Sequence, residues 1–185
     1  MDKLFSTILL LSLLLISIFI LGTNCHEFSR RLSKKTMGLK RQKLSHLHFY
    51  FHDQVSGKNP TAIKICNTSV TGFGLLAMID DTLTIGPEPN SKLVGRAQGV
   101  YAQSSLNDDS LLMVFNFAFV QGKYNGSSLS VLGRNSVMLP LREMPVIGGS
   151  GVFRFAYGYA QAKTYSYNVK TGDAVSEYDV YVFHY

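Results

Sequence analysis

One carboxylate stands at the end of a strongly apolar stretch. Leu47, Phe49 and Phe51 alternate with polar residues, and Asp53 continues the apolar face. If that face points inward, burial raises the pKa of the Asp53 carboxyl and lets it act as an acid, a base or a hydrogen-bond partner for a phenol. The spacing equally allows Asp53 to cap the turn over residues 54–57, so both interpretations stay open at this point.

Two histidines lie two residues apart on the opposite face of the same stretch. Residues i and i+2 of a β-strand share a face, so His46 and His48 could bind one metal ion. Cupin barrels combine such a pair with a following Glu and a further His, whereas the only later histidine outside this stretch is His184. The sequence therefore predicts no metal site, and we expect this histidine row to face solvent or an interface.

Two arginines stand among apolar residues in the last third of the chain. The planar donor fork of Arg134 or Arg142 could orient the oxygen of a phenolate or a carbonyl group near a cavity. The alternative is a structural ion pair, with Glu143 or Asp53 as the partner. The residue types alone do not decide between these two interpretations.

Other motifs argue against familiar enzyme classes. Residues 148–151 share their glycines with phosphate-binding loops, but no Lys-Ser/Thr pair and no helix follow, so a tight turn is expected there. No Gly-x-Ser-x-Gly elbow in a strand-to-helix setting occurs, and no Cys/His pair is expected in the core. The sequence therefore does not favour a hydrolase.

Short apolar, β-branched or aromatic runs separated by turn residues make up most of the chain. The run over 44–53 alternates with the period of a strand, and no run keeps helical periodicity over a dozen residues. Further runs occur at 61–65, 74–79, 93–102, 111–120, 128–132, 152–162, 165–169 and 175–185. Asn125-Gly126 between two runs predicts a hairpin with a type I′ turn.

These elements predict an all-β fold. About eight strands without crossover helices favour an antiparallel sandwich or barrel. We prefer an eight-stranded antiparallel β-barrel, because closure removes the edges that such apolar strands would expose. A barrel of about eight strands can hold one small ligand, so polar residues on its apolar strands are the candidate site.

Composition and charge limit the possible functions. The 185 residues suffice for one domain and a leader, and only two cysteines exclude a Cys-rich metal site. The net charge is +6, but seven basic residues cluster over 30–43, and the chain beyond Lys43 holds ten Lys/Arg and ten Asp/Glu. A neutral body predicts no nucleic-acid partner. We expect the basic segment over 26–43 to be a flexible arm that could bind an anionic cell-wall polymer.

The first 25 residues have the layout of a secretory signal peptide. A short basic start is followed by an unbroken apolar stretch over 8–21 and by small or polar residues up to Cys25. A membrane anchor is the alternative, but the basic residues follow on the side that would be translocated. We therefore divide the chain into a signal peptide (1–25), a basic arm (26–43) and a barrel domain (44–185). Sequons at Asn67 and Asn125 fit a secreted glycoprotein.

Several sequence blocks resemble the plant dirigent proteins. They are residues 49–53 (Phe-Tyr-Phe-His-Asp), 94–99 (Val-Gly-Arg-Ala-Gln-Gly), 113–116 (Met-Val-Phe-Asn), 132–135 (Leu-Gly-Arg-Asn), 142–151 (Arg-Glu-Met-Pro-Val-Ile-Gly-Gly-Ser-Gly) and 177–185 (Glu-Tyr-Asp-Val-Tyr-Val-Phe-His-Tyr). The resemblance spans residues 44–185 and implies an eight-stranded antiparallel β-barrel, related in fold to allene oxide cyclase. It also implies a homo-oligomer, trimer or dimer, that is secreted to the apoplast and needs no cofactor. An external laccase or peroxidase would make phenoxy radicals, and the barrel would orient them during coupling.

The resemblance carries over to the pocket only in part. Asp53, Tyr101 and Arg142 match pocket residues of lignan-forming members, whereas Asn135 replaces a second Asp and Gln103 replaces a Tyr. An amide cannot act as a carboxylate base. These departures place the chain nearer the broad subgroup that includes pterocarpan synthases.

Three mechanisms follow from the resemblance. In the first, a guide without catalytic chemistry aligns two monolignol-type radicals for stereoselective coupling in lignan or other phenylpropanoid biosynthesis, with Asp53, Tyr101 and Arg142 as hydrogen-bond partners. In the second, a dehydrating lyase closes an isoflavanol-derived quinone methide: Asp53 protonates the leaving hydroxyl and Arg142 steadies the quinone methide oxygen. In the third, the barrel binds ligands passively and needs no acid.

Overall fold

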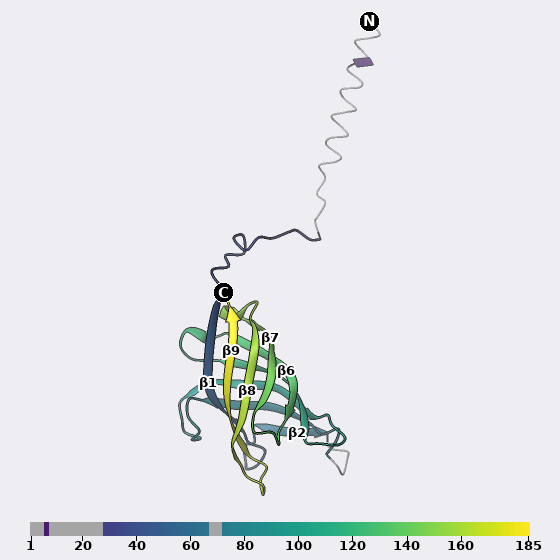
Figure 1. Cartoon of the computed structure of the whole chain (residues 1–185), viewed down its shortest axis with the longest axis vertical. Helices are drawn as coiled ribbons and strands as arrows, with labels where there is room; N and C mark the ends of the chain where they lie inside the picture. Colours follow the sequence, from purple (N-terminus) through teal and green to yellow (C-terminus); the bar gives the residue numbers. More distant parts are fainter. Residues whose placement is uncertain (1–5, 8–27, 67–71) are drawn as a thin grey trace. The chain divides into compact units, whose positions relative to one another are not determined.

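The computed structural model describes residues 6–7, 28–66 and 72–185, and residues 40–185 form one compact unit. Nine strands lie among the described residues: β1 (Lys43–Asp53), β2 (Ala62–Cys66), β3 (Leu76–Thr84), β4 (Leu93–Gln103), β5 (Ser110–Phe119), β6 (Ser128–Ser136), β7 (Arg142–Ser150), β8 (Tyr157–Tyr167) and β9 (Ala174–His184) (Figure 1). Two short 3₁₀ turns, η1 (Gly122–Tyr124) and η2 (Gly151–Phe153), join β5 to β6 and β7 to β8. No helix among the described residues is long and apolar enough to cross a membrane.

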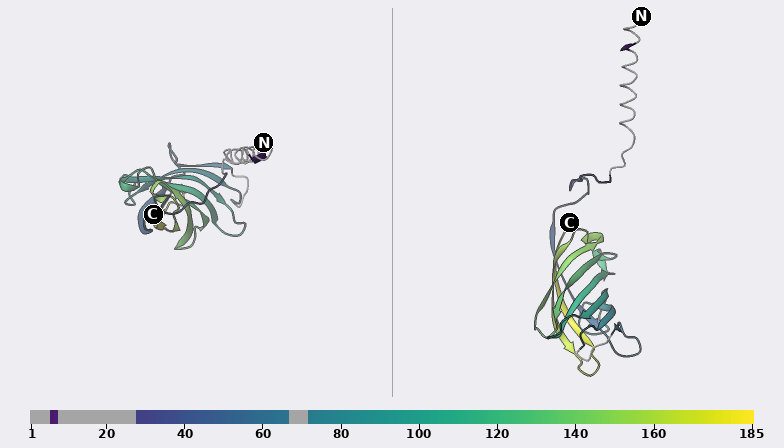
Figure 2. Two further views of the ribbon diagram at one scale, coloured as in Figure 1. Left: turned by 90° about the horizontal axis from the view of Figure 1, so that it is seen from above. Right: turned by 90° about the vertical axis from the view of Figure 1, so that its right-hand side faces the viewer.

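Eight of the strands close into an antiparallel barrel. From β3 to β9 each strand pairs with the next, β9 pairs along its length with β1, and β1 returns to β3 (Figures 1 and 2). The closing ladder is short, because only residues 50–52 of β1 pair with residues 82–84 of β3. Where β1 leaves β3, β2 takes the same edge. The predicted eight-stranded antiparallel β-barrel is confirmed.

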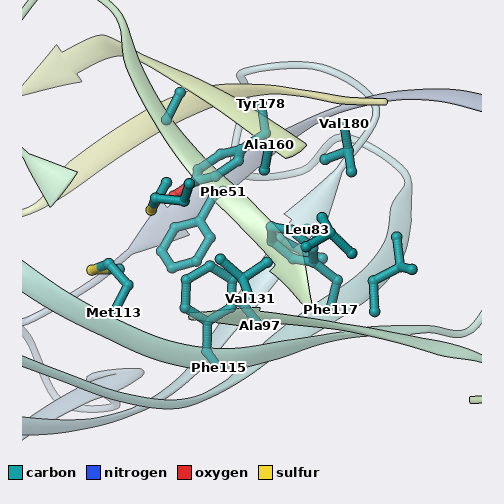
Figure 3. Close-up of a cluster of buried hydrophobic side chains, with 14 of the residues drawn as sticks. Phe51, Leu83, Ala97, Met113, Phe115, Phe117, Val131, Ala160, Tyr178 and Val180 are labelled. Carbon is teal, nitrogen blue, oxygen red and sulfur yellow. The ribbon is translucent and has the colours of Figure 1, made fainter. Parts of the chain in front are cut away.

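Alternation along the strands fills the barrel with aromatic side chains. On β5, Phe115 and Phe117 point inward and are buried (Figure 3), whereas Asn116 between them faces outward. Phe117 makes edge-on contacts with Phe49 and Phe115, each at 4.9 Å between ring centroids. Edge-to-face pairs are a preferred aromatic geometry, so this core is both apolar and well specified.

A second cluster of aromatic side chains, here called the aromatic plug, closes the end of the barrel near η1 and η2. Phe153 of η2 is fully buried, stacks on Tyr124 at 4.9 Å and meets the ring of His184 edge-on at 5.1 Å. Phe119 completes the group, at 5.7 Å from Phe153. These four rings fill this end of the barrel. A polar site inside the barrel would therefore lie at the opposite end.

The turn between β5 and β6 differs from its prediction. The two strands form the predicted hairpin, with Ala118 opposite Ser128. Asn125 has φ −52° and ψ 131° and Gly126 has φ 76°, which are the angles of a type II turn, so the predicted type I′ turn is wrong. The 3₁₀ turn η1 lengthens the connection and removes the need for positive φ at Asn125.

Strand β7 was expected to be loop and turn. Its glycines and Pro145 are poor strand formers, which hid it in the sequence. The ladder between β6 and β7 ends at Val131 opposite Val146, so Pro145 lies outside it and pairs only with Tyr159 of β8. Strand β8 is one continuous element, where the sequence suggested two runs.

Parts of the predicted organisation fall on residues that the structure does not describe. The predicted signal peptide over 1–25, residues 6–7 apart, and the sequon at Asn67 lie outside the described residues. In the predicted basic arm, nearly all side chains over 28–42 are exposed, and β1 begins at Lys43. The second sequon residue, Asn125, is exposed beside η1.

Candidate functional site

A cavity of about 880 Å³ lies inside the end of the barrel opposite the aromatic plug. The ends of β1, β4, β6 and β8 and the starts of β5, β7 and β9 meet there. The predicted site residues Asp53, Tyr101, Asn135 and Arg142 all line this cavity. Its apolar wall includes Phe51, Leu111, Met113, Val137, Leu139 and Tyr178. An apolar cavity with a few convergent polar groups is the usual form of a small-molecule site.

Asp53 is the last residue of β1, and its carboxyl is largely withdrawn from water. Burial raises its pKa from 3.8 to about 6, the charge of Asp173 adds to this, and a hydrogen bond from the Tyr101 hydroxyl opposes it. Its Oδ1 atom is buried and has no hydrogen-bond partner among the described residues. Asp53 therefore has one oxygen without a partner among the described residues and keeps its proton in mildly acidic solution.

Arg142 begins β7 and is held by neutral groups. Its Nε donates to Oδ1 of Asn135 at 3.1 Å, and its Nη1 donates to Thr164 Oγ1 at 2.9 Å and to the carbonyl of Leu139 at 3.3 Å. Neither suggested ion-pair partner, Glu143 or Asp53, is among its contacts. Burial lowers the pKa of the guanidinium. A cation without a carboxylate partner is suited to an oxygen that carries developing negative charge.

The amide of Asn135 has a definite role in this arrangement. Its oxygen accepts the bond from Arg142, and both side chains are buried. Gln103, the other departure from the lignan-forming pattern, lines the cavity but donates its side-chain amide to the carbonyl of Asp108 at 2.8 Å. Arg134 faces outward and pairs with Asp108 at 2.8 Å, so it takes no part in the cavity.

Sequence reasoning missed three polar groups around the cavity. Tyr178 of β9 is buried in the wall, and burial raises the pKa of its hydroxyl. Thr164 holds Arg142, and Asp81 of β3 lies fully buried next to Asp53 in the fold. Asp81 follows Asp80, which faces outward and binds Arg96, and only the alternation of a strand separates the two.

A second hollow of about 890 Å³ lies on the other side of Asp53. It is lined by His52, Thr61, Thr82 and the loop over 166–170, and it shares Asp53, Tyr167 and Ala174 with the first. The His52 ring bonds to the Thr84 hydroxyl at 2.6 Å, and burial lowers its pKa. Asp53 thus stands between two hollows and can be approached from either.

The outward histidines of β1 lie away from the cavity. His46 and His48 are exposed, as the alternation predicted, and each contacts Asp179 of β9. The barrel and its cavity define the class of the protein: a closed antiparallel barrel with a cavity at one end that has the size and lining of a small-molecule site.

Comparison with known proteins gives the family. The sequence model of the dirigent-like proteins matches residues 44–183. Dirigent protein 21 of Arabidopsis thaliana is 51% identical over 167 residues, which cover 88% of each chain. Pterocarpan synthase 1 of Glycyrrhiza echinata is 47% identical over 164 residues, which cover 85% of this chain and 87% of that protein. The chain belongs to the dirigent family.

Solved structures agree with this assignment. The structure of a pterocarpan synthase dirigent protein superposes with a TM-score of 0.76 at 49% identity, covering 79% of this chain and 87% of the other. A second pterocarpan synthase dirigent protein gives a TM-score of 0.74 at 50% identity, covering 77% and 96%. The resemblance noted in the sequence is confirmed.

Proposed function

We propose that the cavity around Asp53 binds a phenolic intermediate and fixes the stereochemistry of the bond that it forms. The observation that supports this is Asp53 itself: a carboxyl that lines the cavity, keeps its proton up to a pH of about 6 and has no ionic partner among the described residues. A proton donor is of use in the dehydrating closure of an isoflavanol-derived quinone methide. The sequence and structural relatives named pterocarpan synthases support this form of the reaction.

The cavity groups fit the steps of such a closure. Asp53 donates its proton to the leaving hydroxyl, the C–O bond breaks, and water departs. Arg142 and the Tyr101 hydroxyl stabilise the oxygen of the resulting quinone methide. A second hydroxyl of the same molecule then adds to the methide carbon, and its proton returns to Asp53. The apolar wall holds one face of the intermediate toward the attacking oxygen, which determines the handedness of the product.

The second candidate is guidance of phenoxy-radical coupling in lignan or related phenylpropanoid biosynthesis, with radicals made by an external laccase or peroxidase. The size of the cavity favours it, because about 880 Å³ is near the upper end of the range of about 300–1,000 Å³ for small-molecule sites. Two small phenols fit such a volume. The relatives named dirigent proteins support this form.

One paired experiment separates the two forms. The purified protein is given a racemic isoflavanol without an oxidant and, separately, coniferyl alcohol with a laccase, and products are resolved by chiral chromatography. Ring closure in the first reaction is the expected result. Enantiomeric excess in the second reaction alone would assign radical guidance, and failure of both would overturn the proposal.

We also propose that the barrel assembles into a homo-oligomer, as a trimer or dimer. An apolar row crosses the outer face of five adjacent strands in register: Ile63, Met78, Val100, Val114 and Leu132. Contiguous exposed apolar surface marks an interaction site. Sedimentation analysis of the wild type and of Val114→Glu tests this: the wild type should have the larger mass. The same mass for both proteins at all concentrations would contradict the proposal.

Secretion to the apoplast and glycosylation at Asn67 and Asn125 remain proposals. The apolar leader and the exposed position of Asn125 support them. The mass of the protein recovered outside plant cells, before and after glycosidase treatment, tests both. Salt extraction from cell walls with and without residues 26–43 tests whether the basic arm binds an anionic polymer.

A further inference from the structure

Two carboxyl groups oppose each other where the barrel closes. Strands β1 and β3 pair in the register Phe51 opposite Leu83 and His52 opposite Thr82. One residue further, the same register places Asp53 opposite Asp81. Phe51 and Leu83 are both buried, and the alternation of a strand gives Asp53 and Asp81 the same inward face. Like charges directly opposite one another destabilise a sheet, so this pair needs a compensating feature.

Among the described residues, no basic side chain forms an ion pair with either carboxyl. Asp81 has no exposed surface; one oxygen accepts a bond from the Thr61 hydroxyl, and Oδ2 has no partner among the described residues. The charge of Arg96 lowers the pKa of Asp81 a little, but the guanidinium forms its ion pair with Asp80 on the outer face.

The other ionisable groups around the pair do not supply it either. Asp53 is faced by the hydroxyl of Tyr101 and influenced by the carboxylate of Asp173. The hydroxyl of Tyr178 and, beyond it, the guanidinium of Arg142 lie on the cavity side of the pair, and the carboxylate of Asp80 adds negative charge near Asp81. Two buried carboxyls without a cation between them cannot both be ionised at low cost.

We propose that Asp53 and Asp81 share one proton, and that Asp81 holds this proton for Asp53. Asp81 does not line the cavity, so it acts through Asp53 and is a positioning residue. The inference rests on the proposed role of Asp53 as the acid. When Asp53 is ionised, the O–H of Asp81 passes its proton to Asp53, which gives it to the leaving hydroxyl. The proton released on ring closure returns through Asp53 to Asp81, so the pair regains its starting state.

The electrostatics of the pair agree with this geometry. Burial and the charge of Asp53 raise the pKa of Asp81 to about 8, above the value of about 6 for Asp53. Between these values the pair retains one proton. The protein would therefore keep a usable acid over about two pH units more than a lone Asp53 would allow.

The substitution Asp81→Asn tests the proposal. The Asn amide can still donate a hydrogen bond to Asp53 but cannot give up a proton. The alkaline limb of kcat for oxidant-free closure should move from about pH 8 toward about pH 6, which is a loss of about 50-fold at pH 8 and little loss in acid. The matched control is Asp80→Asn, which removes the neighbouring carboxylate from the outer face and should leave the limb in place.

Other outcomes are equally informative. An unshifted limb in a folded Asp81→Asn protein would overturn the shared proton while leaving Asp53 as the acid. Full activity of Asp53→Asn would overturn the proposed function itself. If Asp81→Asn does not fold, wild-type unfolding decides: stability should fall between pH 6 and pH 8, and a flat profile there would overturn the proposal.

A separate observation concerns the outer face of β1 and β9. His46 Nε2 lies 2.7 Å and His48 Nδ1 lies 3.0 Å from the same atom, Asp179 Oδ1. The other ring nitrogen of His48 lies 3.7 Å from Glu177 Oε1. The ring of His46 stacks on Tyr181 at 4.6 Å, which restricts its orientation. Three of these groups, His48, Glu177 and Asp179, each place a ligand atom within 4.8 Å of the others, and His46 contacts the same oxygen of Asp179.

We infer that this cluster binds a zinc-like divalent transition-metal ion. Imidazole and carboxylate ligands suit Zn²⁺, and bonds of about 2.0–2.1 Å in a tetrahedral site put neighbouring ligand atoms about 3.3 Å apart. The contact between His48 and Asp179, at 3.0 Å, is close to that spacing. One imidazole gives a single ion only one of its nitrogens, so the carboxylate of Glu177, now 3.7 Å from the other nitrogen, would reach the ion by a rotation of its side chain. This departs from the absence of metal predicted from the sequence, because the carboxylates come from a strand about 130 residues away.

Calorimetric titration of the metal-free protein with Zn²⁺ tests the site. One equivalent per chain should bind, His48→Ala should abolish binding, and Asp179→Asn should weaken it at least about tenfold. His52→Gln is the matched control, since His52 lies on the same strand but bonds to Thr84. No binding by the wild type, or equal binding by His48→Ala, would overturn the inference.

Discussion

The same strands form both ends of the barrel, but the two ends bury different kinds of side chain. At the closed end, Phe119, Tyr124 and Phe153 pack against one another, and His184 bonds to the Ser45 hydroxyl at 2.9 Å. At the open end, Asp53 and Asp81 face each other without a cation. One strand, β1, runs from Phe49 in the core to Asp53 at the cavity.

This difference separates the side chains that stabilise the fold from those that carry the proposed chemistry. Aromatic rings at the closed end are removed from water and contact one another, so their burial stabilises the barrel. Carboxyls at the open end are removed from water without ionic partners, so their ionisation destabilises it. The closed end should therefore tolerate substitution least in unfolding experiments, and the open end least in activity assays.

The largest expected effect is on stability at the closed end. Phe153→Ala removes a fully buried ring and should lower the free energy of unfolding by about 3–5 kcal/mol. Denaturant unfolding measures this. The exposed neighbour in Val152→Ala is the control and should change stability by less than about 0.5 kcal/mol. A small effect of Phe153→Ala would mean that the plug does not carry the stability assigned to it.

The next effect is on the reaction at the open end. Asp53→Asn keeps the shape of the side chain but removes the proton donor, so the rate of oxidant-free closure should fall at least about 100-fold. Affinity for the substrate should change little, because the amide can still hydrogen-bond. Asp109→Asn changes an exposed carboxylate on the cavity rim and should keep most of the activity. Loss of binding instead of turnover would assign Asp53 to ligand binding alone.

The pH dependence of stability should also separate the two ends. The pKa of Asp53 is about 6 in the folded protein and that of Asp81 about 8, against 3.8 for an unperturbed Asp, so the folded state binds more protons between these values. Stability should then fall as pH rises from about 4 toward 8, by about 1.4 kcal/mol per pH unit for each proton that unfolding releases, and most steeply below about pH 6, where both carboxyls release one. Ion-paired or hydrogen-bonded carboxylates with a lowered pKa, Asp80, Asp108, Asp173 and Asp179, act in the opposite direction below about pH 4.

Thermal unfolding over this range measures the balance. Asp81→Asn should reduce the loss of stability above pH 6, whereas Asp80→Asn should leave that loss unchanged. Stability that rises from pH 5 to pH 8 would contradict the burial of the two carboxyls.

The smallest effect concerns the loops at the open end. Asp173 accepts bonds from the backbone N–H of Val55 and of Ser56 and from the Ser56 and Thr171 hydroxyls. Asp173→Ala should lower stability only slightly and raise KM for the substrate more than it lowers kcat. A change confined to kcat would argue against a role in shaping the cavity entrance.

The spacing of strands and turns in the sequence favoured the barrel, whereas alternation left Asp53 either on the inward face or as the cap of the following turn. Tyr101, Asn135 and Arg142 could be placed in one cavity only through the family resemblance, since they lie on three different strands. Asp81 was missed because two adjacent acidic residues suggest a solvated surface, and only the register with β1 reveals its partner. Strand β7 was missed because its glycines and Pro145 lower strand propensity, while pairing with β8 maintains the strand.

The most direct test of the open end is a ¹³C NMR titration of the Asp53 carboxyl, assigned by its loss in Asp53→Asn and repeated with a bound isoflavanol. The structure predicts a pKa of about 6 and a change in the resonance when the phenolic ligand binds. A pKa near the ordinary value of 3.8, with no response to the ligand, would contradict the assignment of Asp53 as the proton donor of this cavity.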